Sequence, residues 1–145
     1  MLIPSTRRLK ICRSFAPRRK LVIKYLETYG SKARRYFWYD FGEPRASEPG
    51  YRHPVVVVQN NIFNKSRIST TVVCAITSNV TLAAAPGNVF LRKGEANLSK
   101  SCVINISQIE TINKSDLIDK IGTLSKAHLF EVIAGLRLLT EPRNI

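Results

Sequence analysis

Runs of apolar, β-branched residues separated by short polar segments make up the central part of the chain. Residues 55–58 and 70–76 predict two strands, and the aromatic run at residues 32–41 predicts an earlier one. Shorter alternating runs at residues 89–91 and 102–106 predict two further strands. Short strands joined by local turns are typical of a small antiparallel barrel, so this pattern predicts a mainly β fold.

The last quarter of the chain changes to a helical pattern. Residues 115–121 predict a short helix, with Ser115 as its N-cap and Gly122 just past its end. Residues 125–139 predict a longer helix, whose apolar side is formed by Leu129, Val132, Ile133, Leu136 and Leu139. The expected fold class is therefore a small antiparallel β-barrel followed by a C-terminal helix.

Basic residues are concentrated at the start of the chain. Residues 1–35 contain eleven Lys or Arg and one acidic residue, whereas the other 110 residues contain twelve Lys or Arg and nine acids. The +13 formal charge thus lies mostly in the first 35 residues, and residues 1–31 are expected to be a basic extension that is either helical or without fixed structure. It could contact nucleic acid, act as an Arg-rich targeting peptide, or have neither role. Residues 32–145 form the expected folded domain.

Composition excludes several classes of protein. The 44% hydrophobic content is enough for a core, and the uncharged run at residues 68–91 is broken by Pro86 and Gly87, so we expect no membrane span. Three widely separated cysteines lack metal-ligand spacing, so we expect buried thiols in a reducing, cytoplasmic compartment, with no metal and no cofactor.

Polar side chains stand at the ends of the two central strands. One strand is entered through Glu48, Arg52 and His53, and the next one leaves through Thr77, Ser78 and Asn79. Pro54 disfavours a helix at this point and holds His53 extended at the mouth of its strand. If the two strands pair, the two polar clusters lie on one rim of the sheet.

This combination of groups suits the cleavage of RNA without a metal. That reaction needs a base for the 2′-hydroxyl proton, a cation or donor for the phosphate oxygens, and an acid for the leaving 5′-oxygen. A carboxylate, a guanidinium, an imidazole and a hydroxyl can supply all three functions. The rim is therefore the candidate site.

The sequence also resembles the MazF/PemK family, the ribonuclease toxins of type II toxin–antitoxin systems. The matching motifs occur in family order and are WYDFG at 38–42, SEPG at 47–50, PVVVVQN at 54–60, AITS at 75–78, VINISQ at 103–108 and TINK at 111–114. The resemblance implies an SH3-like barrel of the MazF/CcdB type and a homodimer. It also implies metal-independent, sequence-selective cleavage of single-stranded RNA to 2′,3′-cyclic phosphate ends, and inhibition by a small acidic antitoxin.

Residue by residue, the resemblance implies that Thr77 is the catalytic threonine and Glu48 the glutamate of the substrate loop. The family's catalytic arginine stands directly before the proline, a place that His53 takes here, with Arg52 one position earlier. Neighbours in a strand face opposite ways, so either the loop lets Arg52 take the role or His53 holds it. An imidazole titrates near neutrality and can be both acid and base, which a guanidinium cannot.

We therefore expect His53 to act as acid and base, Arg52 and Thr77 to stabilise the phosphorane, and Glu48 to orient the nucleotide or share the proton transfer. The candidates for RNA contact are Arg45, Ser47, Lys65, Arg67, Ser78 and Asn79. Two of the four aromatic residues at 36–39 are expected in the core, which leaves the others free to stack on bases. The family commonly has Gly-Asp where Arg34 and Arg35 stand.

Two other readings stay open at the level of sequence. One is a toxin-fold module that inhibits by binding a protein, as gyrase-poisoning relatives of this superfold do. The other is an inactive remnant that only binds its antitoxin. Both arise from the shifted arginine, because the family's residue before Pro54 is absent.

Overall fold

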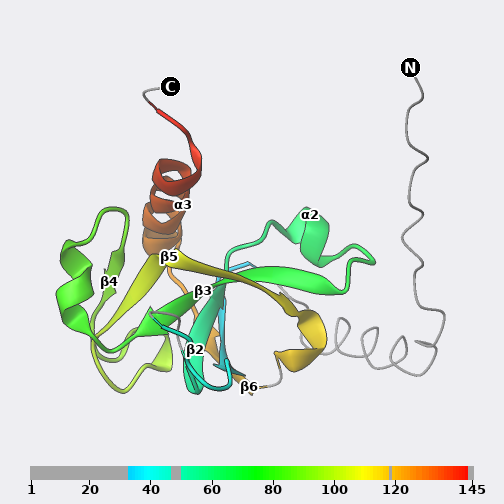
Figure 1. Cartoon of the computed structure of the whole chain (residues 1–145), viewed down its shortest axis with the longest axis horizontal. Helices are drawn as coiled ribbons and strands as arrows, with labels where there is room; N and C mark the ends of the chain where they lie inside the picture. Colours follow the sequence, from blue (N-terminus) through cyan, green and yellow to red (C-terminus); the bar gives the residue numbers. More distant parts are fainter. Residues whose placement is uncertain (1–32, 47–49, 118, 144–145) are drawn as a thin grey trace.

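Six antiparallel strands form one sheet that curls into a half-barrel, and a helix follows it at the C-terminal end (Figure 1). The computed structural model describes residues 33–46, 50–117 and 119–143. In sequence order the strands are β1 Arg35–Asp40, β2 Arg52–Val57, β3 Thr70–Thr77, β4 Val89–Leu91, β5 Cys102–Asn113 and β6 Asp119–Thr123. They are arranged in the sheet as β4-β5-β3-β2-β1-β6. The predicted fold class is confirmed, and the basic extension at residues 1–31 lies outside the described residues.

Pro54 is the third residue of β2, because the strand begins at Arg52, three residues before the predicted run at 55–58. It pairs with Trp38 of β1, whereas the pairing of β2 with β3 begins only at Val55, opposite Ala75. A proline cannot donate to a ladder, and here it stands beyond the last paired residue on the β3 side. The strand therefore extends back to Arg52 along β1 alone.

The short helix predicted at residues 115–121 is wrong. The chain instead forms a 3₁₀ turn, η3 Lys114–Asp116, and then strand β6. β6 pairs with β1, which would otherwise be an unpaired edge of the sheet. Gly122 lies within this strand, and an added Cβ would stand 2.4 Å from the carbonyl oxygen of Ala96. Pairing with the sheet thus outweighs local helix-capping signals that stabilise only a few backbone groups.

Strand β5 is longer than predicted, with twelve residues instead of five. The part of β5 beyond Ile106 is mostly polar and contains Ser107, Gln108 and Glu110, which hides the apolar alternation of a strand. The register against β3 shifts between Cys74 and Ile76, so β5 bends and continues along the first half of β3. This bend curls the sheet.

Both faces of the sheet carry a hydrophobic core. One cluster includes Tyr36, Val56 and Cys74 and extends to β4 and the C-terminal helix, and the other contains Phe37 and Val55. Tyr36 and Phe37 are consecutive and both fully buried, because each one faces a different cluster. As expected, two of the four aromatic residues at 36–39 are in the core, whereas Trp38 is exposed and Tyr39 half-buried.

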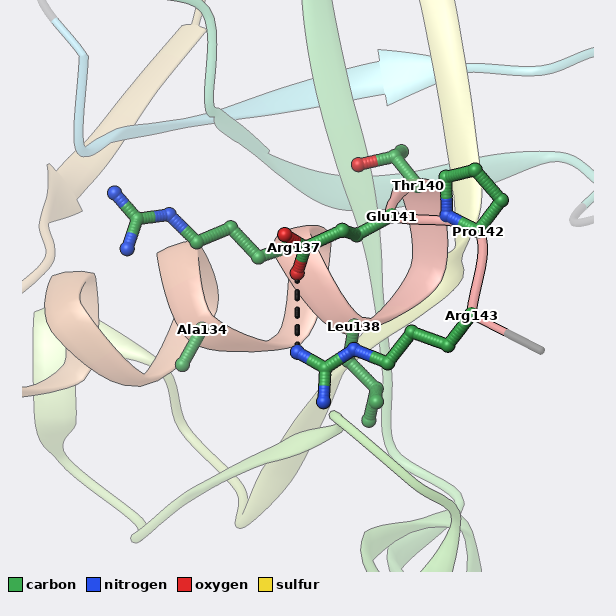
Figure 2. A pocket seen from close by; sticks show the side chains of 7 residues that line it. All are labelled: Ala134, Arg137, Leu138, Thr140, Glu141, Pro142 and Arg143. Carbon is green, nitrogen blue, oxygen red and sulfur yellow. Dashed lines mark hydrogen bonds and ion pairs between the residues drawn. The ribbon is translucent and has the colours of Figure 1, made fainter. Parts of the chain in front are cut away.

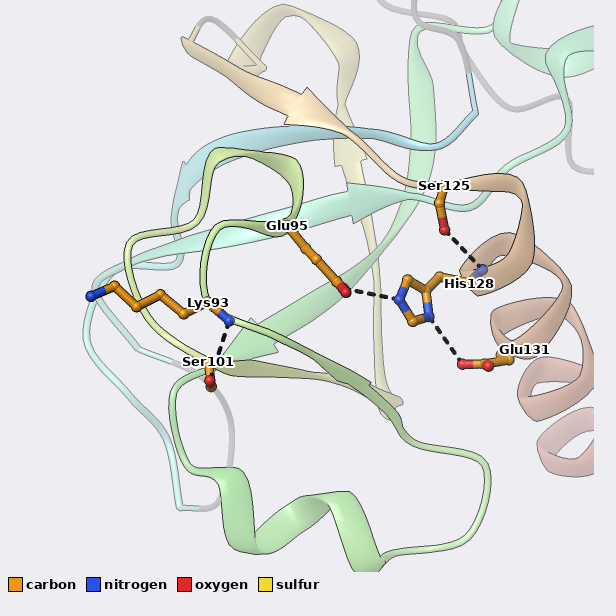
Figure 3. Close-up of polar contacts among 6 residues, drawn as sticks. All are labelled: Lys93, Glu95, Ser101, Ser125, His128 and Glu131. Atoms are coloured by element: carbon orange, nitrogen blue, oxygen red, sulfur yellow. Dashed lines mark hydrogen bonds and ion pairs between the residues drawn. The ribbon is translucent and has the colours of Figure 1, made fainter.

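Helix α3, Lys126–Thr140, lies against β4 and β5 and covers the larger cluster. Its N-cap is Ser125, whose hydroxyl accepts from the amide of His128 at 3.2 Å (Figure 3). The ring of His128 lies 2.9 Å from a Glu95 oxygen and 3.1 Å from a Glu131 oxygen, so this side chain helps to hold the start of the helix against the loop before β5. No described helix is long and apolar enough to cross a membrane.

The predicted apolar side of α3 is only partly buried. Val132 is fully buried and Leu129 and Leu136 are half-buried, whereas Ile133 and Leu139 are exposed. Phe130 and Leu138 are exposed as well, so this helix leaves apolar surface uncovered in the single chain.

A short helix, α2 Asn61–Asn64, lies in the connection between β2 and β3, which the sequence predicted only as a polar segment. Buried Lys114 from η3 donates from its Nζ to the carbonyl oxygens of Asn64 at 2.8 Å, Phe63 at 3.3 Å and Ser66 at 3.4 Å. Burial lowers the pKa of this ammonium. Lys114 thus holds the end of α2 against the body of the sheet.

The backbone conformation of Arg34 is expected to lower the free energy of unfolding, and replacement of Arg34 by glycine is expected to raise it. Its φ of +78° is a left-handed conformation that is unfavourable for a side-chain-bearing residue. Two backbone bonds impose it, from Arg34 N to Val57 O at 2.9 Å and from Leu124 N to Arg34 O at 2.7 Å. Arg34→Gly should therefore raise the free energy of unfolding by about 1 kcal/mol in urea titrations.

Arg35→Gly is the matched control, because Arg35 is a regular strand residue whose replacement by glycine should lower stability. An Arg34→Gly protein that unfolds at lower urea than the parent would contradict the strain at this position.

Candidate functional site

His53 and Thr77 stand at the same end of adjacent strands. The register of β2 and β3 runs from Val57 opposite Val73 to Val55 opposite Ala75, and His53 and Thr77 each lie two residues beyond that last pair. Directly opposed residues of an antiparallel pair point to the same face of the sheet. By alternation His53 and Thr77 keep the face of Val55 and Ala75, so the structure places an imidazole-bearing and a hydroxyl-bearing residue at the same end of the sheet.

The two faces can be assigned from the cores. Val55 and Val57 belong to one cluster and Val56 to the other, so alternation places His53 with the first pair. The ring centroids of His53 and Phe41 are 6.4 Å apart, and Phe41 packs against the same cluster. His53 is half-buried there.

Arg52 lies on the opposite face from His53. Its guanidinium donates to a carboxylate oxygen of Asp119 at 2.8 Å and lies 5.2 Å from the ring centroid of Trp38. Both Arg52 and Asp119 are more than half exposed, so this ion pair is a weak constraint. In this arrangement Arg52 does not face the phosphate site that His53 and Thr77 would form.

Aromatic side chains flank His53, and sequence reasoning did not single them out for this position. Tyr39 pairs with His53 across β1 and β2, and its ring meets Phe41 edge-on with centroids 4.8 Å apart. Burial raises the pKa of Tyr39, and the carboxylates of Asp116, Glu110 and Asp40 add to this rise. Tyr39 and Phe41, called here the aromatic wall, could have been placed beside His53 only from the strand register, which the sequence does not specify.

The loop after Thr77 is closed by local hydrogen bonds. The amide of Asn79 donates to Thr77 Oγ1 at 3.1 Å, which leaves the hydroxyl proton free for another acceptor. Asn79 Oδ1 accepts from Thr81 Oγ1 at 2.6 Å and caps the 3₁₀ helix η1, Val80–Ala84. Ser78 is exposed between them. Both Ser78 and Asn79 thus lie beside the catalytic candidates.

The other RNA-contact candidates are spread over the molecule. Lys65 and Arg67 are exposed beyond α2, at the opposite end of β2 from His53. Arg45 is exposed in the loop between β1 and β2, at the same end of the sheet as His53. Ser47 and Glu48, from the same loop, lie outside the described residues.

A shallow hollow lies away from this rim, at the C-terminal end of α3 (Figure 2). Within it Arg143 pairs with Glu141 at 3.0 Å, and none of its lining residues comes from β2 or β3. No group of three or more metal-ligating side chains is gathered in the described part of the chain. Cys74 and Cys102 are buried, and burial raises the pKa of the Cys74 thiol to about 12, so this thiol is not a nucleophile at neutral pH.

Known proteins resemble this chain in sequence and in fold. Residues 34–140 match the family model described as PemK-like, MazF-like toxin of type II toxin-antitoxin system. Endoribonuclease MazF2 of Mycobacterium bovis and Endoribonuclease MazF6 of Mycobacterium tuberculosis are each 44% identical over 101 residues, which is 70% of this chain and 89% of either relative.

A solved structure supports the fold. The structure of an endoribonuclease in complex with its cognate antitoxin from Mycobacterial species matches with a TM-score of 0.63 and 20% identity. The match covers 78% of this chain and 98% of the solved one. Sequence and fold together show that this chain belongs to the PemK-like, MazF-like toxin family of type II toxin–antitoxin systems.

Proposed function

We propose that this chain is an endoribonuclease toxin that cleaves single-stranded RNA in the cytoplasm without a metal. The observation that carries the proposal is the 44% identity to proteins named endoribonucleases, and the placement of His53 and Thr77 at the same end of the neighbouring strands β2 and β3 supports it. An imidazole can take and return a proton, and a hydroxyl can donate a hydrogen bond to a phosphate oxygen.

In the proposed reaction His53 takes the proton of a ribose 2′-hydroxyl, and the 2′-oxygen attacks the adjacent phosphorus. The bond from phosphorus to the 5′-oxygen breaks, and the departing oxygen receives a proton from the imidazolium. The products are a 2′,3′-cyclic phosphate and a 5′-hydroxyl. The hydroxyl of Thr77 donates a hydrogen bond to a nonbridging oxygen as negative charge develops there.

Glu48 and Arg52 remain parts of the proposal with narrower roles. Glu48 orients the nucleotide from the β1–β2 loop or shares the proton transfer. Arg52 stabilises charge only if its exposed pair with Asp119 opens, because the described arrangement turns it to the other face. His53 therefore takes the place that the family gives to arginine.

Cleavage of a long single-stranded RNA in excess EDTA tests this function. We expect discrete fragments that end in cyclic phosphate, and no cleavage where a single deoxyribose replaces the ribose at the scissile position. Intact RNA after incubation with the purified protein would contradict the proposal, as would cleavage at the deoxyribose, since both outcomes exclude attack by the 2′-hydroxyl.

The proposed partners are a second copy of the chain and a small acidic antitoxin. Support for an antitoxin comes from the relative whose structure contains one. The exposed apolar residues of α3, Phe130 and Leu138 among them, offer surface that an isolated chain leaves uncovered. Sedimentation of the purified toxin would show whether it forms the expected dimer.

A further inference from the structure

The segment between β2 and β3, residues 61–68 and called here the α2 segment, exposes large apolar side chains next to positive charges. Ile62 is 76% exposed, Phe63 52% and Ile68 46%. Lys65 and Arg67 are exposed in the same segment, and within the described part of the chain their side chains make no hydrogen bond or ion pair. Exposure of these apolar side chains to water is unfavourable unless a ligand or partner covers them.

This segment is held firmly in place. Asn64 is fully buried and donates from Nδ2 to Gln59 O at 2.7 Å, while its Oδ1 accepts from Thr71 at 2.9 Å. Lys114 binds the carbonyls at the end of α2 from the other side. The exposed residues are therefore presented by a preorganised turn, which lowers the entropy lost when a ligand binds.

The α2 segment is distant from the rim where cleavage is proposed. β2 advances about 3.3 Å per residue, so His53 and Val57 alone are separated by roughly 13 Å, and α2 follows Val57. In Figure 1, α2 projects from the body of the sheet near the first half of β3, whereas Thr77 ends the strand. A ligand that touches both places must be extended.

We propose that the α2 segment is a second contact site for single-stranded RNA, with Phe63 stacking on a base and Lys65 and Arg67 contacting phosphates. The inference rests on the proposed function. Aromatic stacking flanked by cations is how proteins hold unpaired strands without reading their sequence. Charge favours RNA as the occupant: residues 49–94 contain no acidic residue, and η3, which anchors the segment, adds only Asp116.

The site should matter only for substrates long enough to reach it. We expect Phe63→Ala to weaken binding of an RNA of about twenty nucleotides by about tenfold, measured by fluorescence anisotropy, and to leave cleavage of an RNA of about six nucleotides unchanged. Lys65→Ala with Arg67→Ala should reduce the slope of log affinity against log salt by about 1.4, the value for two phosphates on a single strand.

Two substitutions separate stacking from other contacts. Phe63→Trp should retain affinity for the long RNA, whereas Phe63→Leu, which keeps an apolar side chain, should lose it. Phe130→Ala on α3 removes an equally exposed phenyl group elsewhere and should not change RNA affinity. Circular dichroism should show all variants folded, since each replaced side chain is exposed.

Unchanged long-RNA affinity in Phe63→Ala would overturn the proposal, and so would full affinity in Phe63→Leu. A change of oligomeric mass in Phe63→Ala with RNA affinity intact would also overturn it and would assign the segment to contact between copies. Binding is measured separately from cleavage. If the parent protein cleaves the short RNA and Phe63→Ala binds the long RNA normally, the second site is disproved and the proposed function stands.

Discussion

Replacement of His53 by alanine is expected to slow RNA cleavage by about 10² to 10⁴-fold, the usual contribution of a positioned general acid or base. Imidazole chemistry allows a proton to be both taken and returned, which a hydroxyl or a guanidinium does not offer. Thr77 ends the neighbouring strand β3 and can stabilise charge, but its hydroxyl cannot act as a base there. Single-turnover cleavage of a saturating RNA measures this effect separately from binding.

Arg52→Ala is the matched control, because Arg52 is the neighbouring residue of the same strand and faces the other way. It should change the cleavage rate by less than about fivefold, since its contacts are Asp119 and Trp38. If Arg52→Ala instead abolishes cleavage and His53→Ala does not, Arg52 swings into the site and holds the role that we assign to His53.

His53→Arg adds a sharper readout, because it places the family's residue before Pro54. An arginine stays protonated throughout the accessible pH range, so it stabilises charge without exchanging protons as readily as an imidazole. We expect this variant to keep part of its activity and to show a flatter pH dependence than the parent between pH 5 and 8. A parent with a flat profile would contradict acid–base catalysis by His53.

Replacement of Lys114 by methionine is expected to lower the free energy of unfolding by about 3 kcal/mol. The fully buried ammonium donates to three carbonyl oxygens, and methionine fills similar space without a donor. The carbonyls of Phe63, Asn64 and Ser66 would then lose a charged donor in a site away from water. Urea unfolding gives the magnitude, and limited trypsin digestion should reveal new cleavage after Lys65 or Arg67.

Lys120→Met is the control, since Lys120 is an exposed residue of β6 and should change stability by less than about 0.5 kcal/mol. A Lys114→Met protein as stable and as trypsin-resistant as the parent would show that the carbonyls find other donors.

The Lys114 substitution should also change how stability depends on alkaline pH. Burial lowers the pKa of Lys114, so as pH rises the folded chain releases this proton before the unfolded chain does. Within that window the unfolded state binds more protons, and the contribution of Lys114 to unfolding free energy rises with pH. The stability difference between parent and Lys114→Met should therefore widen from neutral pH towards about pH 10, near the ordinary lysine pKa.

Periodicity and turn residues were sufficient to predict β1 to β4 and α3, because each of these elements carries its own pattern. Val55 to Val57 and Val73 are apolar on both faces, as expected of central strands with a core on each side. Polar residues at the ends of two such strands predicted a site rim, and the structure places His53 and Thr77 at the same end of β2 and β3, while their catalytic roles stay predictions. Local sequence signals fail where pairing with a distant strand determines the structure. An example is β6, which pairs with the edge of β1 although Ser115 is a good helix N-cap.

The sequence by itself determined the family, the central strands and the types of chemical group at their ends, because motifs and alternation are local properties of the chain. Only the tertiary structure decided that Arg52 turns towards Asp119 while His53 faces the aromatic wall, and that buried Lys114 anchors the α2 segment. These contacts join residues 67 and 50 positions apart in the two hydrogen-bonded pairs. Strand register and the closure of the sheet create them, and no short stretch of sequence encodes either one.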